Sequence, residues 1–299
     1  METPIRAELV VDARASLGEG PVWDDRANLL YWVDIEGRAL HVSDPSGGAD
    51  RRVKLAGRTG FVALRAGGGL IAGGESGLFE LDPDSGRATP LVDPEADLPD
   101  NRFNDGKCDP VGRLWAGTMS MKPQPGAGSL YRLDPGGACT RMLQGVSVSN
   151  GLGWSLDAKV MYYIDSRAGE VSAFDFDARG GDISNRRTLI PFGDQPGSPD
   201  GMCVDAEGMI WVAHFRGGCV SRWNPASGER LALLEVPAPR TTSCTFGGAA
   251  LDELYVTTAR AGLHEAELKQ FPHSGGLFRL KPGPKGLPPT RFAATTFPQ

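Results

Sequence analysis

Short apolar segments recur along the whole chain, and turns rich in glycine, aspartate and proline separate them. Each repeat begins with a short apolar strand, and a partner strand follows it. The first strands are predicted at residues 30–33, 70–73, 114–117, 160–163, 210–213 and 254–257. The partner strands are predicted at residues 40–43, 78–81, 130–133, 171–174, 220–223 and 277–280. Successive repeats begin 40 to 50 residues apart.

Six registered repeats of this length indicate an all-β fold, a six-bladed β-propeller. We expect four-stranded antiparallel blades that together occupy residues 1–299 as a single domain. A blade cannot cover both of its faces alone, so the blades pack around an axis. A strand near Glu8 to Asp12 is expected to pair with the last blade and close the ring. A β-sandwich or two small β domains would supply short strands but would not explain six repeats in register.

One position is polar in most repeats. Asn104, Asn150 and Asp200 each stand ten residues before the first strand of their repeat. Glu19 stands eleven residues before its strand, with one inserted residue in the turn at Asp25. The same count reaches Gly60 and Cys244 in the two remaining repeats. This position begins the innermost strand of a blade, so in a closed ring it points at the axis.

A glycine beside each of the four polar residues allows the backbone to turn sharply. Asn-Gly and Asp-Gly are also ordinary turn dipeptides, but a turn role alone does not explain a register that four repeats share. Carboxylate and amide oxygens that meet on an axis need a cation between them. Hard oxygen ligands suit Ca²⁺, Mg²⁺, Mn²⁺ or Zn²⁺ and discriminate poorly among these ions.

The motifs around these residues resemble those of the senescence-marker-protein/gluconolactonase/luciferin-regenerating-enzyme family. The matching stretches cover the chain in order and are residues 17–21, 102–107, 149–152, 198–201, 217–220 and 246–248. The resemblance implies a six-bladed propeller with one divalent metal ion on its axis. It also implies an enzyme that hydrolyses sugar-acid lactones.

The resemblance assigns a role to individual residues. It implies that Glu19, Asn150 and Asp200 bind the metal ion and that Asn104 lies beside them. Asp200 is the candidate catalytic residue, which orients or deprotonates water while the ion polarises the lactone carbonyl. Arg102 is implied to contact the substrate, since its planar guanidinium suits sugar hydroxyls. A surface or salt-bridge arginine is the equal alternative for Arg102.

One loop departs from the family pattern. Many members carry an acidic residue after the Gly-Thr-Met segment, where it meets sugar hydroxyls. This chain has Met121 and Lys122 at that place. The departure concerns substrate preference and leaves the metal ligands untouched.

Composition excludes several classes of function. The formal net charge of −6 comes from interspersed charges without a Lys/Arg stripe, which argues against nucleic acid as a partner. Only residues 263–270 suggest a helix, and no apolar stretch is long enough to span a membrane. The start of the chain lacks the pattern of a secretory signal. The five cysteines are widely spaced, which fits reduced, mostly buried thiols in a cytoplasmic protein.

Together these observations predict a cytoplasmic, metal-dependent lactonase. Its partner is a small-molecule sugar lactone such as gluconolactone, galactonolactone, xylonolactone or arabinolactone, and no obligate protein partner is expected. One alternative is a related propeller that hydrolyses other esters, including organophosphates. Another is a Ca²⁺-binding regulatory propeller without turnover. The presence of Arg102 and Asn104 beside the metal cluster favours chemistry over binding alone.

Overall fold

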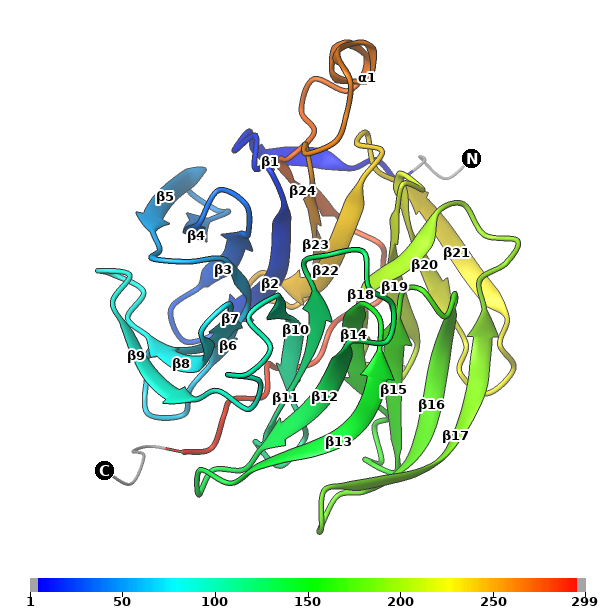
Figure 1. Ribbon diagram of the computed structural model, residues 1–299. Coiled ribbons are helices and arrows are strands. Elements are labelled where there is room, and N and C mark those ends of the chain that lie inside the picture. Colours follow the sequence, from blue (N-terminus) through cyan, green and yellow to red (C-terminus); the bar gives the residue numbers. More distant parts are fainter. Residues whose placement is uncertain (1–4, 295–299) are drawn as a thin grey trace.

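Twenty-four strands and one short helix make up the regular structure of residues 5–294, the part of the chain that the computed structural model describes. The strands form six four-stranded antiparallel sheets, the blades of Figure 1. Blade 1 consists of β2 (Gly18–Asp24), β3 (Leu29–Asp34), β4 (Ala39–Asp44) and β5 (Ala49–Lys54). Blade 2 consists of β6 (Thr59–Leu64), β7 (Leu70–Gly74), β8 (Gly77–Leu81) and β9 (Ala88–Val92). Blade 3 consists of β10 (Asn101–Cys108), β11 (Leu114–Ser120), β12 (Gly128–Leu133) and β13 (Cys139–Val146). Blade 4 consists of β14 (Ser149–Trp154), β15 (Val160–Asp165), β16 (Glu170–Asp177) and β17 (Asp182–Pro191). Blade 5 consists of β18 (Ser198–Val204), β19 (Ile210–Phe215), β20 (Cys219–Trp223) and β21 (Arg230–Glu235). Blade 6 consists of β22 (Thr241–Gly247), β23 (Glu253–Thr258), β24 (Leu277–Leu280) and β1 (Glu8–Val11).

The six blades close into a ring. Each innermost strand contacts the innermost strand of the next blade, from β2 through β6, β10, β14, β18 and β22 back to β2. The predicted first strands are the second strands of their blades, and their predicted partners are the third strands. The structure therefore confirms the six-bladed β-propeller and excludes the sandwich alternative.

The N-terminal strand completes the last blade. β1 pairs antiparallel with β24, with Glu8 opposite Arg279 and Leu9 opposite Phe278. An ion pair of 2.9 Å between Arg279 Nη2 and Glu8 Oε2 reinforces the contact. The predicted ring closure is confirmed, and it satisfies the edge of β24 that would otherwise stay unpaired.

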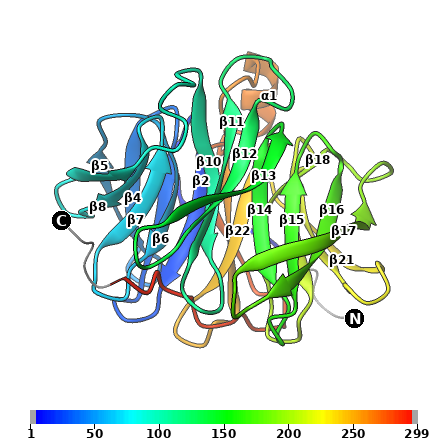
Figure 2. The ribbon, with the colours of Figure 1, turned by 60° about the horizontal axis from the view of Figure 1, so that its bottom comes forward.

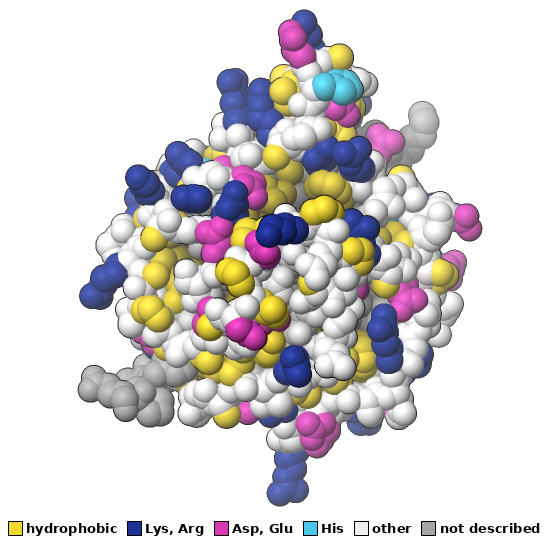
Figure 3. All heavy atoms as spheres, viewed as in Figure 1, with side chains coloured by type: hydrophobic (Ala, Val, Ile, Leu, Met, Phe, Trp, Pro, Cys, Tyr) yellow, Lys and Arg dark blue, Asp and Glu magenta, His cyan; other side chains and the backbone are white. Residues whose placement is uncertain are grey.

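Apolar side chains of the inner strands fill the spaces between blades. Trp32, Trp115 and Trp211, all on second strands, are almost completely buried. Burial of one large apolar side chain contributes about 2–3 kcal/mol relative to leaving it exposed. The outermost strands face water instead, and the arginine pairs at residues 51–52 and 186–187 lie exposed on β5 and β17. In the face shown in Figure 3, basic and acidic side chains are intermixed over the surface.

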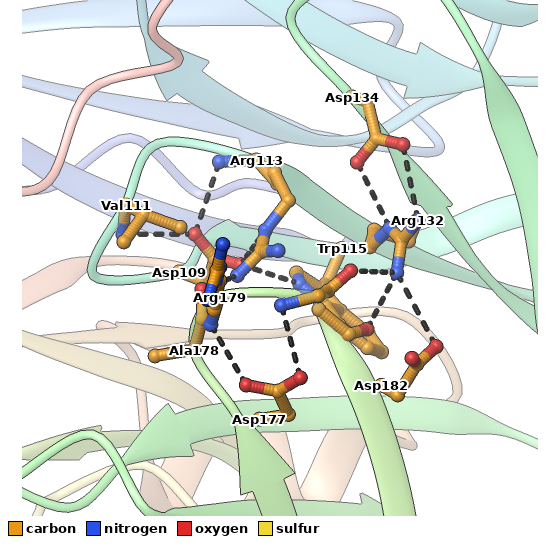
Figure 4. Close-up of polar contacts among 12 residues, drawn as sticks. Asp109, Val111, Arg113, Trp115, Arg132, Asp134, Asp177, Ala178, Arg179 and Asp182 are labelled. Carbon is orange, nitrogen blue, oxygen red and sulfur yellow. Dashed lines mark hydrogen bonds and ion pairs between the residues drawn. The ribbon is translucent and has the colours of Figure 1, made fainter.

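Buried aspartates join the ends of strands and fasten one blade to the next. Asp109, which follows β10, accepts hydrogen bonds from Trp115 Nε1 at 3.1 Å and from Arg113 Nε at 2.6 Å. The same guanidinium reaches blade 4, where Arg113 Nη2 donates to Ala178 O at 2.8 Å (Figure 4). Asp205 makes similar contacts within blade 5, where it accepts from Trp211 Nε1 at 2.9 Å and from Arg222 Nε at 2.8 Å. These contacts hold the tryptophans in a fixed orientation between the blades.

His214 on β19 lies between blades 4 and 5. Its side chain is buried against Phe192, and its Nδ1 lies 2.8 Å from Pro196 O. Its Nε2 lies 2.6 Å from Ser221 Oγ, which also accepts from Trp223 Nε1. A neutral ring that donates through Nδ1 and accepts at Nε2 satisfies this network.

Burial lowers the pKa of His214 below its ordinary 6.5, and the Arg230 charge acts in the same direction. The unfolded chain therefore binds a proton more readily than the native chain. Since the folded-state pKa is depressed, the contribution of His214 to stability is complete above pH 6.5 and is lost as the pH falls below it. We expect the free-energy difference between wild type and His214→Gln, measured by urea unfolding at pH 7.5 and 5.0, to shrink at the lower pH. An unchanged difference would contradict this assignment.

Two segments leave the blades. Helix α1 (Glu265–Gln270) begins at His264, which forms a capping box with Glu267, and it confirms the predicted helical insertion in the last repeat. The C-terminal segment 281–294 follows β24 and crosses the end of the ring opposite to α1, drawn in red at the bottom of Figure 2. The two segments thus lie on opposite sides of the ring in Figure 2, and α1 projects from its edge in Figure 1.

Candidate active site

The four predicted polar residues lie at one end of the ring. Glu19 is on β2, Asn104 on β10, Asn150 on β14 and Asp200 on β18. Each falls in the first half of an innermost strand, and each side chain is at most 9% exposed. Since these strands surround the axis, the structure brings the four residues toward one point from four blades.

Every innermost strand is irregular at this level. The pairing of β2 with β3 shifts between Glu19 and Val22, and that of β18 with β19 shifts between Pro199 and Met202. The corresponding shifts lie between residues 59 and 61, 103 and 105, 149 and 152, and 241 and 243. A β-bulge bends a strand and re-aims its side chains. One bulge in each blade accounts for the register that the polar residues share.

The sixth blade corrects one predicted position. Its bulge contains Thr242, whereas the count along the sequence reached Cys244. The reason is the hairpin after β22, which is longer than the others, since Phe246 pairs with Leu254. Thr242 Oγ1 donates to Gly18 O at 2.6 Å, so this residue joins two blades. Cys244 lies further along the same strand.

The glycines beside the polar residues have two different roles. Gly20 has φ of +53°, the left-handed conformation that the predicted sharp turn requires. Gly201 allows a close approach, because a Cβ atom there would lie 2.0 Å from Ser243 Oγ on the neighbouring strand. A Cβ atom on Gly151 would lie 2.8 Å from Asp200 O. At these two positions the glycine permits tight packing of innermost strands, not a turn.

Hydrogen bonds join the amide residues across blades. Asn104 Nδ2 donates to Ser149 O at 2.7 Å and to Asn150 Oδ1 at 3.2 Å. Asn150 Nδ2 donates to Ser166 Oγ at 2.8 Å, and Ser166 Oγ donates to Pro199 O at 2.7 Å. The chain of contacts therefore runs from blade 3 through blade 4 to the residue before Asp200. It fixes the oxygen of Asn150 in place without a ligand.

The carboxylates at this end are buried close to one another. Burial raises the pKa of Glu19 to about 8, with the negative charge of Asp105 as the second cause. Burial and then the charges of Glu19 and Asp105 raise the pKa of Asp200 well above its ordinary range. Asp105, which the register count did not reach, also has a pKa raised by burial. The site concentrates negative charge in a poorly solvated space.

These residues fit a hard divalent cation. No Lys, Arg or His within residues 5–294 forms an ion pair with Glu19 or Asp200. The positive charge of Arg102 acts on Glu19 without direct contact and only partly opposes the effect of burial. In the same range, no group of three or more His, Cys, Asp or Glu side chains could hold a metal ion. An ion here would therefore rest on two carboxylates and the amide oxygen of Asn150. Such an all-oxygen set suits Ca²⁺, Mg²⁺ or Mn²⁺ and tolerates Zn²⁺.

Arg102 lies inside the site, so the surface alternative for this arginine is wrong. Its side chain is only 6% exposed, and its Nη1 donates to Asn104 Oδ1 at 2.6 Å and to Phe103 O at 3.0 Å. Burial lowers the pKa of Arg102, and the nearby Glu36 and Glu19 oppose that shift. The arrangement orients a buried guanidinium beside the carboxylate cluster.

The divergent loop lies between β11 and β12, at the same end of the ring. Lys122 Nζ forms an exposed ion pair of 2.6 Å with Asp100, and Met121 is 40% exposed. Met121 or Lys122 stands where the resemblance leads one to expect an acidic residue, and the charge of Lys122 is already paired. The loop therefore offers different chemistry to a substrate.

Known proteins share this sequence and this fold. A family model described as SMP-30/Gluconolactonase/LRE-like region matches residues 17–260. Regucalcin of Xenopus laevis is 42% identical over 97% of this chain and 99% of its own length. A Bacillus subtilis (strain 168) protein named "Putative sugar lactone lactonase YvrE" is 40% identical over 96% of this chain and 98% of its own length.

A solved structure agrees closely with this one. Regucalcin from Agrobacterium tumefaciens, described as a calcium-binding protein, is 31% identical and superposes with a TM-score of 0.92. The match covers 98% of this chain and 99% of that chain. Among the described residues, no helix is long and apolar enough to cross a membrane.

Proposed function

Because this chain belongs to the SMP-30/gluconolactonase/LRE-like family, we propose that it hydrolyses the lactone of a sugar acid with a divalent cation as cofactor. Candidate substrates are gluconolactone, galactonolactone, xylonolactone and arabinolactone. We further propose that residues 1–299 act as one domain and that the reaction takes place in the cytoplasm. All five cysteines are free, in keeping with a reducing compartment.

One observation carries the proposal: Glu19 and Asp200 are buried, and their charges interact at the end of the ring where hydrogen bonds orient the amide of Asn150. Glu19, Asn150 and Asp200 would hold the cation. When bound, the ion would polarise the lactone carbonyl and stabilise negative charge on its oxygen. The Bacillus subtilis relative, which is named "Putative sugar lactone lactonase YvrE", supports the choice of substrate class.

The residues of the chain supply positioning and proton transfer. Asp200 would orient a water molecule or accept its proton, because its carboxyl is buried close to Glu19 and forms no ion pair with a side chain of the described residues. Arg102 offers guanidinium donors to the oxygens of the substrate, and Asn104 holds that guanidinium in orientation. The burial of these groups strengthens each of these contacts.

The alternative of a Ca²⁺-binding protein without turnover draws support from the calcium-binding relative. The position of Arg102 argues against it. A buried guanidinium close to Glu19 opposes the binding of a second positive charge, so a site for cations alone would gain nothing from it. A substrate with developing negative charge, in contrast, benefits from it.

The first experiment removes bound metal with a chelator and follows proton release from a panel of aldonolactones while each divalent ion is added back. We expect hydrolysis to exceed the spontaneous rate only after addition of an ion, and at least one lactone to be preferred. Tight binding of the ion without turnover on any lactone would favour the binding protein. Turnover of organophosphate or simple esters alone would favour the related esterase.

A further inference from the structure

A cavity of about 370 Å³ occupies the other end of the propeller axis. Its wall comes from the second halves of the innermost strands and from the turns that follow them, including Pro21–Trp23 of β2 and Leu152–Trp154 of β14. None of Glu19, Asn104, Asn150 and Asp200 lines it. Asp105, a member of the buried carboxylate cluster, lines the inner end of the cavity. The cavity therefore approaches the candidate active site from the opposite end of the ring, and its volume is within the range of small-molecule sites.

The cavity wall is mostly apolar and aromatic. Trp23, Trp154 and Phe246 contribute rings, and valine and leucine side chains lie between them. The indole N–H of Trp154 has no hydrogen-bond partner among the described residues. Two further wall residues, Leu156 and Leu287, are 54% and 40% exposed. Since exposed leucines line it, the cavity opens to solvent through an apolar rim.

Charged groups lie deeper along β10. Lys107 lines the cavity, and its Nζ donates to Met202 O at 2.5 Å. The ammonium group forms no ion pair with any residue in the described range. An ammonium carries three donors, so two remain for an acceptor in the cavity. Asp105, at the inner end, lies near enough to Lys107 for their charges to interact.

The C-terminal segment crosses the mouth of this cavity and is anchored on both sides of it. At one side, Gly286 N donates to Leu251 O at 2.7 Å and Ala206 N donates to Lys285 O at 2.8 Å. At the other side, Phe292 N donates to Leu64 O at 2.8 Å and Arg291 pairs with Asp24. Between these anchors, residues 287–290 line the cavity.

We propose that this cavity is a second ligand site, which binds a small monocarboxylate with an apolar body. The aromatic and aliphatic wall would take the apolar body, and the free donors of Lys107 would take the carboxylate. A sugar acid carries the same carboxylate, but most of its hydroxyls would lose their water against the aromatic and aliphatic part of the wall. Only the Trp154 indole N–H and a few serine and threonine hydroxyls could replace that water. The ligand therefore differs in class from the product of the proposed lactonase.

Octanoate, 1-octanol and gluconate separate the two requirements. Octanoate has both the apolar body and the carboxylate. Octanol has only the apolar body, and gluconate has only the carboxylate. Calorimetric titration of the full-length protein should give a Kd of about 0.1–1 mM for octanoate. Octanol should bind about tenfold more weakly, and gluconate should not bind at this site. Equal binding of gluconate, or no binding of octanoate, would refute the proposal.

Two variants locate the site. Lys107→Met should weaken octanoate about tenfold and leave octanol within about twofold. Leu156→Asp places a carboxylate on the exposed rim, where folding is not at risk, and should weaken octanoate by repulsion. Glu19→Gln, at the other end of the axis, should leave octanoate binding unchanged. Loss of octanoate binding in Glu19→Gln, or full binding in both cavity variants, would place the ligand elsewhere.

Discussion

Substitution of Asp200 by asparagine is expected to lower the rate of lactone hydrolysis by about a thousandfold while the propeller stays folded. The side chain of Asp200 is 6% exposed, and it shares its surroundings with Glu19 and Asp105. Asparagine has nearly the same shape, but it neither accepts a proton from water nor brings a full negative charge to a cation. Both proposed roles of Asp200 would therefore be lost together.

The measurement is the initial rate of proton release with saturating metal, together with the calorimetric affinity for that metal. Asp205→Asn is the matched control, since Asp205 is also buried and lies just after the same strand, but its carboxylate accepts a hydrogen bond from Trp211 Nε1. We expect it to retain lactonase activity at 25 °C. Glu19→Gln and Asn150→Ala should each resemble Asp200→Asn in losing most metal-dependent activity. Near-wild-type activity of Asp200→Asn with metal present would show that Asp200 has neither role.

The largest loss of stability is expected from Asp109→Ala. Asp109 is completely buried and accepts four hydrogen bonds, from Val111 N, Arg113 N, Arg113 Nε and Trp115 Nε1. Without the carboxylate, the guanidinium of Arg113 would stay buried next to an unpartnered indole N–H. Removal of one partner from a buried ion pair costs about 3–5 kcal/mol. The free energy of unfolding should fall by about this amount.

Thermal unfolding followed by circular dichroism would detect the change as a decrease in Tm of roughly 6–10 °C. Asp84→Ala provides the comparison, because Asp84 is 87% exposed and its ion pair with Arg51 is solvated. We expect less than about 1 kcal/mol from that variant. Similar losses in the two variants would mean that Asp109 is not the joint between blades 3 and 4 that Figure 4 indicates.

The repeat in the sequence was sufficient to predict the architecture. The second strand of each blade is buried between neighbouring strands and blades, so it is apolar. An apolar run such as that of β19 can therefore be recognised in the sequence alone. The N-terminal strand could be predicted from the need to close the ring. The position of the polar residues was visible because one β-bulge per blade keeps their spacing nearly constant.

Other features depend on contacts that no single-sequence pattern records. Asp105 is adjacent to Asn104, and regular strand alternation would turn these neighbours to opposite faces. The bulge between Phe103 and Asp105 removes that alternation, and it leaves no signal in composition. Thr242 was missed because the longer hairpin of the last blade changed the count. The cavity beneath the C-terminal segment was missed because its wall combines residues from all six blades.

The pairing of β1 with β24 has a consequence for synthesis of the protein on the ribosome. Glu8 and Arg279 are 271 residues apart in the chain, yet their strands share one sheet. The first strand to leave the ribosome must therefore remain unpaired until almost the entire chain has emerged. During that interval β1 exposes an open edge to other nascent chains. The ring can therefore be completed only near the end of translation. A chain that stops before β24 is released with the backbone hydrogen bonds of β1 unpaired.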